Sequence, residues 1–529
     1  MIRRPACVTV LVVAAAVAAC KTTTGVSSGG APASGEFSDN PLVAFIPADT
    51  AYAFATFKPP PLDVFRKLAA MMGPIWRRAF ASSMSREAQT ADQRRSLDDV
   101  LHVFDTLDVK TFEDHGFSAK ARFAAYGIAG YPVFRVEVLS GDRVFELIRS
   151  TAVRWNDKLP PPTERAGRRY WIFDQRKFSV FVAIAAKELV VAAAPRRVLD
   201  TYLAQLVGEQ PPANHLTTAQ FRALAERDGF SAAGVGFVDL ARAGSLVVDA
   251  TGVGSECGAA VAALARRTPR LAVGYSELTV HRMGFGMIVE VAPDLLTQLR
   301  GLAGSLAGFD RVLAQRPAMA IAVAGNIEHG RALVAKAAGS LQELGERCQI
   351  PGLIDHMASV ISSAGRPLPP VIAGMRGGFL VLSNLKMGAS GPETIEGFGS
   401  LQLDDAGALL ALLSSQLPGL EIKADRKAHA LPALIPFPGH VAASERAIGV
   451  ALGANSAAVA VDTLQGTAAP APLAVFALDY SRLGQLVLSD MHGEEAEAMR
   501  TIMDAFGLAT LQIAVDARGV VMSGMFELR

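Results

Sequence analysis

The chain has 529 residues, half of them hydrophobic, and its 51 basic and 50 acidic residues give a formal net charge of +1 at pH 7. A nearly neutral chain lacks the basic surface of nucleic-acid-binding proteins, so we expect no nucleic-acid partner. The length exceeds what one hydrophobic core usually supports, which predicts at least two domains.

The first twenty residues have the layout of an export signal. Arg3 and Arg4 precede an apolar run over 6–16, and Val17-Ala18-Ala19 places small residues directly before Cys20. A transmembrane helix needs about 20 apolar residues, so this run is too short to span a bilayer stably. We therefore predict a cleaved signal peptide over residues 1–19.

Val17-Ala18-Ala19-Cys20 resembles the lipobox of bacterial lipoproteins, which implies that Cys20 becomes the acylated N-terminus. Lys21 follows where Asp would imply retention at the inner membrane, so the resemblance implies an outer-membrane protein facing the periplasm. Each buried CH₂ of an acyl chain contributes about 0.8 kcal/mol, and two or three chains hold a folded body at a membrane. A plain secretory signal with an incidental cysteine is the alternative.

Residues 21–40 consist mainly of Thr, Ser, Gly, Ala and Pro. Such a segment buries too little apolar surface to offset the entropy lost on folding. We predict the lipidated cysteine and a flexible tether over residues 20–41, and a folded body from residue 42.

The folded body opens with Phe45-Ile46-Pro47-Ala48-Asp49-Thr50 before a predicted strand at 51–57. This opening resembles that of bacterial envelope proteins whose folded region begins with an apolar residue, Pro-Ala-Asp-Thr and a strand. The resemblance implies membership over much of 42–529, but it brings no activity. Pro47 and Asp49 also suit a turn that leads into the strand.

Three segments recur in the same order along the chain. Residues 239–247 match 479–487 at five of nine positions, each after a strand-like run and at the start of a predicted helix. Residues 181–194 and 449–462 are both predicted to be hairpins, and 51–55 and 318–322 are predicted strands before helices. The offsets of 267, 268 and 240 residues indicate a tandem duplication.

The predicted fold class is α+β, with two tandem-duplicated halves that contain mixed or antiparallel sheets and packed helices. We predict a strand at 133–139, a helix at 143–155, and strand pairs at 271–291 and 510–528. Residues 295–313 have the spacing of one amphipathic helix. The predicted halves are 42–315 and 316–529.

Two cysteines remain in the body, Cys257 and Cys348. An oxidising compartment permits them to form a disulfide bond. Two separate buried thiols are the alternative, because sequence does not show whether the Cα atoms approach within about 7 Å.

We predict no catalytic, metal or cofactor site. None of the nine histidines lies in a His-Glu-x-x-His pattern, and neither a Gly-x-Ser-x-Gly nor a phosphate-binding glycine motif occurs. Adjacent carboxylates such as Asp404 and Asp405 are predicted to cap a helix. The basic and aromatic residues at 165–178 are predicted to form a half-buried strand rather than a stacking surface for ligands.

We therefore expect a non-enzymatic envelope lipoprotein with a binding or assembly role. Its predicted partners are a membrane, contacted through the N-terminal lipid, and an envelope protein, and its oligomeric state is left open. One alternative is a cell-wall hydrolase whose site is assembled from distant residues, with two carboxylates of raised pKa. Another is a lipid-binding or lipid-carrier protein with an apolar cavity beside 295–313.

Overall fold

The structure is a computed structural model that describes residues 37–64, 66–67, 109–154, 159–175, 178–251, 254–304, 306, 309–388, 391–416, 422–432, 437–464, 471–487, 499–500 and 503–529. The predicted signal peptide, Cys20 and most of the predicted tether lie outside these residues. Among the described residues, unit 1 comprises 37–247 and 270–285, and unit 2 comprises 248–269 and 286–529. The boundaries of these compact units differ from those of the predicted halves 42–315 and 316–529. The two halves stay a prediction.

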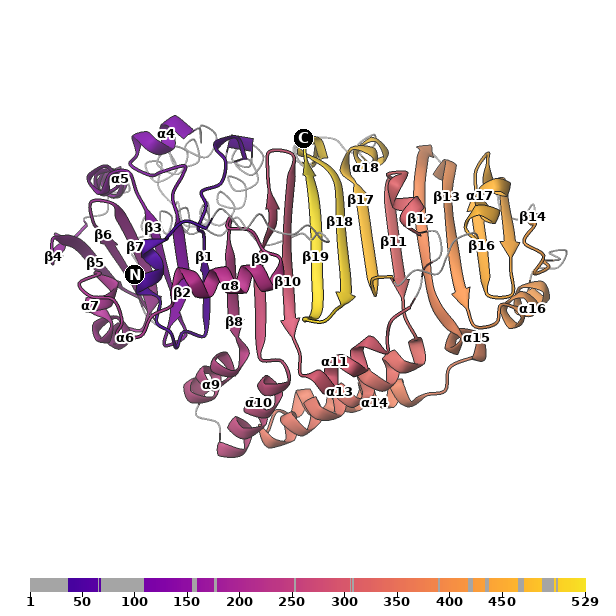
Figure 1. Cartoon of the computed structure of the whole chain (residues 1–529), viewed down its shortest axis with the longest axis horizontal. Helices are drawn as coiled ribbons and strands as arrows, with labels where there is room; N and C mark the ends of the chain where they lie inside the picture. The colour runs from indigo at the N-terminus through magenta and orange to yellow at the C-terminus, as the bar shows by residue number, and fades with distance from the viewer. Residues whose placement is uncertain are drawn as a thin grey trace. The chain divides into compact units, whose positions relative to one another are not determined.

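The predicted α+β class is confirmed, and every strand pairing between described residues is antiparallel. Unit 1 contains a nine-stranded sheet in the order β4-β5-β6-β7-β3-β2-β1-β8-β9. Its elements, drawn from indigo to magenta in Figure 1, are η1 (Pro41–Phe45), β1 (Tyr52–Ala55), α4 (Val109–Asp114), β2 (Phe123–Ile128), β3 (Tyr131–Glu137), α5 (Gly141–Arg154), β4 (Thr163–Arg165), β5 (Arg168–Asp174), β6 (Ser179–Ile184), β7 (Glu188–Ala194), α6 (Arg196–Thr201), α7 (Leu203–Leu206), α8 (Thr218–Asp228), β8 (Val235–Asp239), the start of α9 (Leu240–Thr251) and β9 (Arg270–Leu278).

The predicted hairpin of unit 1 is confirmed as β6 and β7, and every residue of β6 is buried. Helix α5 lies beside this hairpin, where Val144 and Ile148 pack against Trp171, Val182 and neighbouring side chains. Strands that are covered on both faces read as continuous apolar runs, which is why this hairpin was visible in the sequence.

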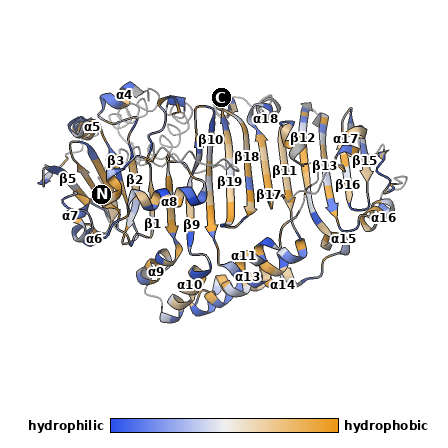
Figure 2. Cartoon of the chain, viewed as in Figure 1, coloured by the Kyte–Doolittle hydropathy of each residue, from blue (hydrophilic) through white to orange (hydrophobic). Residues whose placement is uncertain are grey.

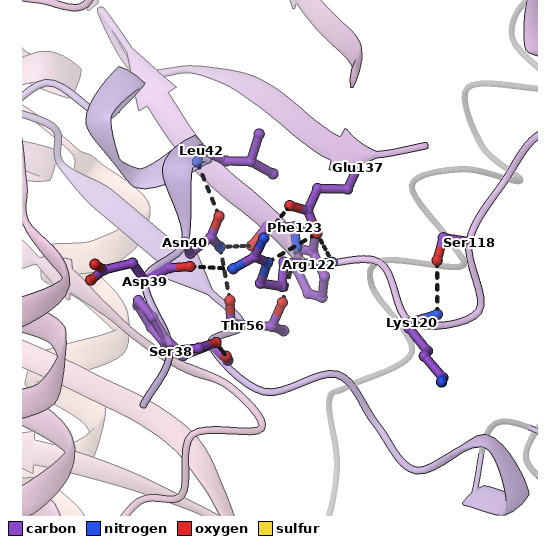
Figure 3. A network of polar contacts seen from close by, with 11 residues as sticks. Ser38, Asp39, Asn40, Leu42, Thr56, Ser118, Lys120, Arg122, Phe123 and Glu137 are labelled. Atoms are coloured by element: carbon purple, nitrogen blue, oxygen red, sulfur yellow. Dashed lines mark hydrogen bonds and ion pairs between the residues drawn. The ribbon is translucent and has the colours of Figure 1, made fainter. Parts of the chain in front are cut away.

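Of the residues that the structure describes, the first, Phe37, already contacts the body of unit 1, before the predicted end of the tether at residue 41. The Phe37 ring lies 5.1 Å from that of Phe57. Asn40 donates from Nδ2 to the carbonyl oxygens of Thr56 and Phe123, and its Oδ1 accepts from the N–H of Leu42 (Figure 3). The side chain of Asn40 therefore joins the incoming chain to β1 and β2.

Arg122 completes this network from the start of β2 (Figure 3). Its guanidinium donates to both carboxylate oxygens of Glu137 on β3, at 3.0 and 2.6 Å, and to the carbonyl oxygen of Asp39. The hydrogen bonds to Glu137, partly offset by burial, raise the pKa of Arg122 above its ordinary value. The segment that enters the fold is thus fixed to the first three strands.

Unit 2 contains a ten-stranded sheet in the order β10-β19-β18-β17-β11-β12-β13-β16-β15-β14. Its elements are α10 (Ser255–Arg267), β10 (Arg282–Glu290), α11 (Pro293–Arg300), α12 (Phe309–Ala314), β11 (Met319–Ala324), α13 (Ile327–Arg347), α14 (Pro351–Gly365), α15 (Pro370–Ala373), β12 (Met375–Gly388), β13 (Gly391–Leu403), α16 (Gly407–Gln416), β14 (Ala428–Ala430), β15 (Gly439–Ala443), β16 (Ala447–Leu452), α17 (Ser456–Asp462), β17 (Ala474–Asp479), α18 (Tyr480–Val487), β18 (Phe506–Val515) and β19 (Gly519–Leu528). The strands β4 and β14, three residues each, lie at one end of their sheets.

The prediction of one helix over 295–313 is wrong, because the segment forms the two short helices α11 and α12. Between them, Gly304 lies so close to the sheet that a Cβ there would come within 3.0 Å of backbone atoms of Gly325, Ala324 and Arg376. The side chains of Leu306 and Phe309 follow and pack into the core of unit 2. A continuous helix does not allow this close approach.

The prediction of a hairpin over 449–462 is also wrong. This segment consists of the end of β16 followed by helix α17, and β16 forms a hairpin with the preceding strand β15 instead. An apolar run as short as 456–462 fits a strand or a buried helix equally well, so periodicity could not separate them.

Helices α13 and α14 pack against each other beside the sheet of unit 2 (Figure 1). Cys348 caps the C-terminal end of α13, and a disulfide bond joins it to Cys257 of α10. No residue of α14 is buried, so this helix is held mainly through α13. None of the helices in the described ranges is both long and apolar enough to cross a membrane.

Candidate functional site

A row of exposed apolar side chains crosses the middle of the ten-stranded sheet. Ile321 of β11 is the Cα partner of Leu380 on β12 and of Phe476 on β17, and Phe476 is in turn the partner of Leu511 on β18. These four side chains are 41%, 59%, 36% and 36% exposed. Directly paired residues point to the same side of a sheet, so the row is continuous.

The row continues through Gly399 of β13 to Val450 of β16, and apolar rows lie on either side of it. Three registers on six strands contain only apolar side chains and glycines. We call this set the apolar face: Ala509, Leu511, Ile513, Ala474, Phe476, Leu478, Met319, Ile321, Val323, Gly378, Leu380, Leu382, Gly397, Gly399, Leu401, Ile448, Val450 and Leu452. The strands β11, β17 and β18 are accordingly coloured largely as hydrophobic in Figure 2.

The opposite side of β11, β12 and β17 contributes to a core cluster of unit 2. Ala320, Ala322 and Ala324 of β11 are buried there against Phe379 and Leu306. In β11, small residues thus point to the core, while Met319, Ile321 and Val323 point to the apolar face. An antiparallel strand with one solvated side usually alternates apolar and polar residues, whereas β11 is apolar throughout.

The apolar face has a closed end and an open middle. Leu410 of α16 packs with Val441 and Ile448, and it thereby covers the corner of the face next to Leu401. Away from this corner, Val323 is 57% exposed and Leu380 is 59% exposed. All six strands have neighbours on both sides, so their backbone groups are used within the sheet.

An exposed apolar area of this kind favours contact with another apolar surface. Monomeric soluble proteins rarely leave contiguous apolar patches larger than a few hundred Å² open to water, and larger ones mark interaction sites. Burial stabilises by roughly 25 cal/mol per Å² of apolar area removed from water. With no polar side chain in its three registers, the apolar face can bind a ligand only through this effect and through packing.

Unit 1 contains a buried polar cluster around Arg135. Arg135, fully buried, donates from Nε to the hydroxyl of Tyr126 at 3.0 Å, from Nη1 to Glu188, and from Nη2 to the carbonyl of Gln205 at 2.5 Å. Burial opposes the charged guanidinium, but Tyr126 and Glu188 raise the pKa of Arg135 above its ordinary value. The Phe45 ring lies 4.1 Å from the guanidinium carbon. The contacts of Arg135 join η1, β2, β3, β7 and α7.

A serine and a histidine also meet in unit 2. His440 Nδ1 lies 2.9 Å from Ser456 Oγ, which is the geometry of a nucleophile and its base. Ser456, the first residue of α17, is only 2% exposed, so a substrate does not reach its hydroxyl. The contact therefore fixes the start of α17 on β15.

The predicted disulfide partners are brought together: Cys257 and Cys348 are bonded, with Cα atoms 4.6 Å apart. The adjacent residues Asp404 and Asp405 make different interactions. Asp404 forms an ion pair with Arg376, and Asp405 accepts from the N–H of Gly407 at the start of α16, as a cap does. The segment at 165–178 contains β5, in which Trp171 and Phe173 are buried, so its strand prediction is confirmed for the described residues.

Two carboxylates of unit 2 bear on the hydrolase alternative, Asp425 and Asp479. Hydrogen bonds from the Lys427 N–H and His429 lower the pKa of Asp425. Burial opposes ionisation of Asp479, but hydrogen bonds from Ser481 and Arg482 and the charge of Arg316 lower its pKa as well. Both shifts are opposite to the one that a general acid requires. Among the described residues, no group of three or more His, Cys, Asp and Glu side chains could hold a metal ion.

Comparison with known proteins gives no relative: no family model, curated protein or solved structure matches the chain.

Proposed function

We propose that this protein is a non-enzymatic envelope lipoprotein, anchored through acyl chains on Cys20 at the outer membrane, that binds an apolar ligand or partner on the apolar face. The observation that carries the proposal is the set of three apolar registers on six adjacent strands, exposed at its centre. A folded protein retains such a surface at a cost in solubility, and a binding role accounts for it.

The disulfide supports an extracytoplasmic location for the body. Such bonds persist in the periplasm and outside the cell and are rare in the cytosol. The bond between Cys257 and Cys348 joins residues that are 91 positions apart, and it links α10 to the end of α13. The signal-like leader and the Cys20 lipobox resemblance are independent grounds for the same location.

The proposal includes a tandem duplication of the body. The strand order β5-β6-β7-β3-β2-β1-β8-β9 has the same chain connectivity as β14-β15-β16-β13-β12-β11-β17-β18. Backbone hydrogen bonds recur as well: the N–H of Asp239 donates to Ala51, and that of Asp479 donates to Ala318, at 2.7 and 3.0 Å. In this correspondence, the hairpin β15–β16 occupies the place of the hairpin β6–β7. The match supports the duplication, although the sequence segments that pair differ from the predicted ones.

Binding at the apolar face is tested with a hydrophobic dye, anilinonaphthalene sulfonate, on purified protein. We expect Val323→Asp and Leu380→Asp to reduce dye fluorescence, because a carboxylate disfavours apolar contact. Val153→Asp is the matched control, since Val153 of α5 is 70% exposed and lies outside the apolar face. Equal fluorescence from all three variants and the wild type would refute the proposed surface.

Anchoring is tested separately by Cys20→Ala. We expect this variant to leave the membrane fraction, because its body then lacks the acyl chains that hold it there. The measurement is cell fractionation together with the mass of the mature N-terminal peptide. Unchanged fractionation, or a mature peptide without fatty-acid mass, would refute the lipid anchor.

A further inference from the structure

The apolar face has a distinct strip along β13. Gly397 and Gly399 leave this strand without side chains in two of the three registers, and Gly378 lies beside it on β12. The exposed side chains of Leu380 on β12 and Val450 on β16 border the strip on its two sides. In this strip, the backbone of β13 therefore lies between the apolar side chains of β12 and those of β16.

The dimensions of the strip suit one unbranched hydrocarbon chain. Three registers on one strand span four residue steps, or about 13 Å at roughly 3.3 Å per residue. The acyl chains of one bilayer leaflet span about half of a hydrocarbon core that is roughly 30 Å thick. The helix α16 covers the end of the strip next to Leu401.

The chemistry of the apolar face favours hydrocarbon over a folded protein. Protein interfaces carry about one hydrogen bond per 100–200 Å² and a polar rim around their core. The three registers offer no polar side-chain atom, and the backbone groups are used by neighbouring strands. Any polar group of a protein partner would find no side-chain hydrogen-bond partner there, whereas CH₂ groups need none.

We infer that the strip along β13 binds an acyl chain of a membrane phospholipid, which lies between Leu380 and Val450. This inference rests on the proposed function, because it names the ligand of the apolar face. The lipid headgroup stays outside the three apolar registers, where water remains available to it.

The test places the photoreactive residue benzoylphenylalanine in the full chain, in cells, at Leu380, at Val450 or at the control position Val153. After irradiation, the protein is digested and the mass of the labelled peptide is measured by mass spectrometry. We expect a phospholipid adduct at Leu380 and Val450, at least about tenfold above the adduct at Val153. In the Leu380-labelled chain, Val450→Asp should lower the adduct at least about tenfold, and Val153→Asp should not, because a carboxylate against hydrocarbon is strongly disfavoured.

The outcomes separate this inference from the proposed function. A protein adduct at Leu380, from another protein or from a second copy, overturns the acyl-chain inference and leaves the apolar face as a binding surface. Equal lipid adducts at all three positions also overturn the inference, since they report general proximity to a bilayer. The absence of any adduct at Leu380 and Val450 overturns both. Circular dichroism of each variant confirms that the comparison is between folded proteins.

Discussion

Arg135 and Glu188 form an ion pair in which the arginine side chain is 0% exposed and the glutamate side chain 10%. Glu188 also accepts from Arg168 at 2.5 Å, so one carboxylate balances two guanidinium groups. Removing one partner of a buried pair leaves an uncompensated charge and costs about 3–5 kcal/mol. We therefore expect Glu188→Ala to destabilise unit 1 by about this amount in urea unfolding followed by circular dichroism.

The matched control is Glu146→Ala. Glu146 pairs with Arg149 on the surface of α5, where the two side chains are 57% and 64% exposed. Exposed ion pairs contribute about 0–1 kcal/mol, so this substitution should leave the midpoint nearly unchanged. Similar urea midpoints for the two variants would show that the buried ion pair of Arg135 and Glu188 contributes no more to the free energy of unfolding than an exposed pair.

The disulfide between Cys257 and Cys348 constrains the unfolded chain. It closes a loop of 91 residues, for which loss of chain entropy corresponds to about 4–5 kcal/mol of stabilisation in the loop-closure estimate. We expect reduction to lower the urea midpoint of unit 2 and to increase proteolysis of α13 and α14. The Cys257→Ala, Cys348→Ala double variant should have the same urea midpoint as the reduced protein, and reductant should not change that midpoint. A midpoint that is the same with and without reductant would contradict this prediction.

Asp479 makes the stability of unit 2 dependent on pH. Its pKa is lowered in the folded state, so the stabilisation is present at neutral pH and is lost as the pH falls below the ordinary value of about 4. We expect Asp479→Asn to cost about 1 kcal/mol or more at pH 7, because hydrogen bonds to a charged acceptor are stronger than neutral ones.

The difference between Asp479→Asn and the wild type should shrink in acid, where the wild-type carboxyl is also neutral. Unfolding curves at a series of pH values measure this change. Asp142→Asn provides the control, because the Asp142 side chain is 87% exposed. If the free energies of unfolding of Asp479→Asn and the wild type differed by the same amount at every pH, the charge of the Asp479 carboxylate would not be the cause of the stabilisation.

Gly304 is expected to tolerate no side chain. Its Cβ would come within 3.0 Å of backbone atoms of Gly325 and Arg376, so Gly304→Ala should destabilise unit 2 by about 1–3 kcal/mol. Gly339→Ala is the control: nothing lies within 4 Å of that position in α13, and alanine there should stabilise by up to about 1 kcal/mol. Thermal unfolding would show shifts of opposite sign, and equal shifts would contradict the close approach at Gly304.

Local patterns in the sequence predicted the elements whose two ends were marked by turns. The β6–β7 hairpin was found because Lys187 interrupts two apolar runs, and α5 was found because Val144 and Ile148 have helical spacing. The break between α11 and α12 was missed, because it depends on Gly304 touching β11, a contact between distant parts of the chain. Spacing along the chain contains no information about such contacts.

The apolar face was missed for a different reason. In β11, alanine alternates with Met319, Ile321 and Val323, and both kinds of residue count as apolar. The pattern therefore looks like a strand covered on both sides, and it does not show which side remains open. The useful signal was the alternation in size, since alanine suits the side packed against Phe379 and Leu306.

The length of β4 and β14 affects how copies of the protein behave when they are crowded. Each is only three residues long, so that border of its sheet exposes few backbone groups to a strand from another molecule. Long unpaired strands are templates for fibre growth, and these sheets end without one at that border. At that border, the described strands therefore offer copies of the protein few backbone groups through which to associate.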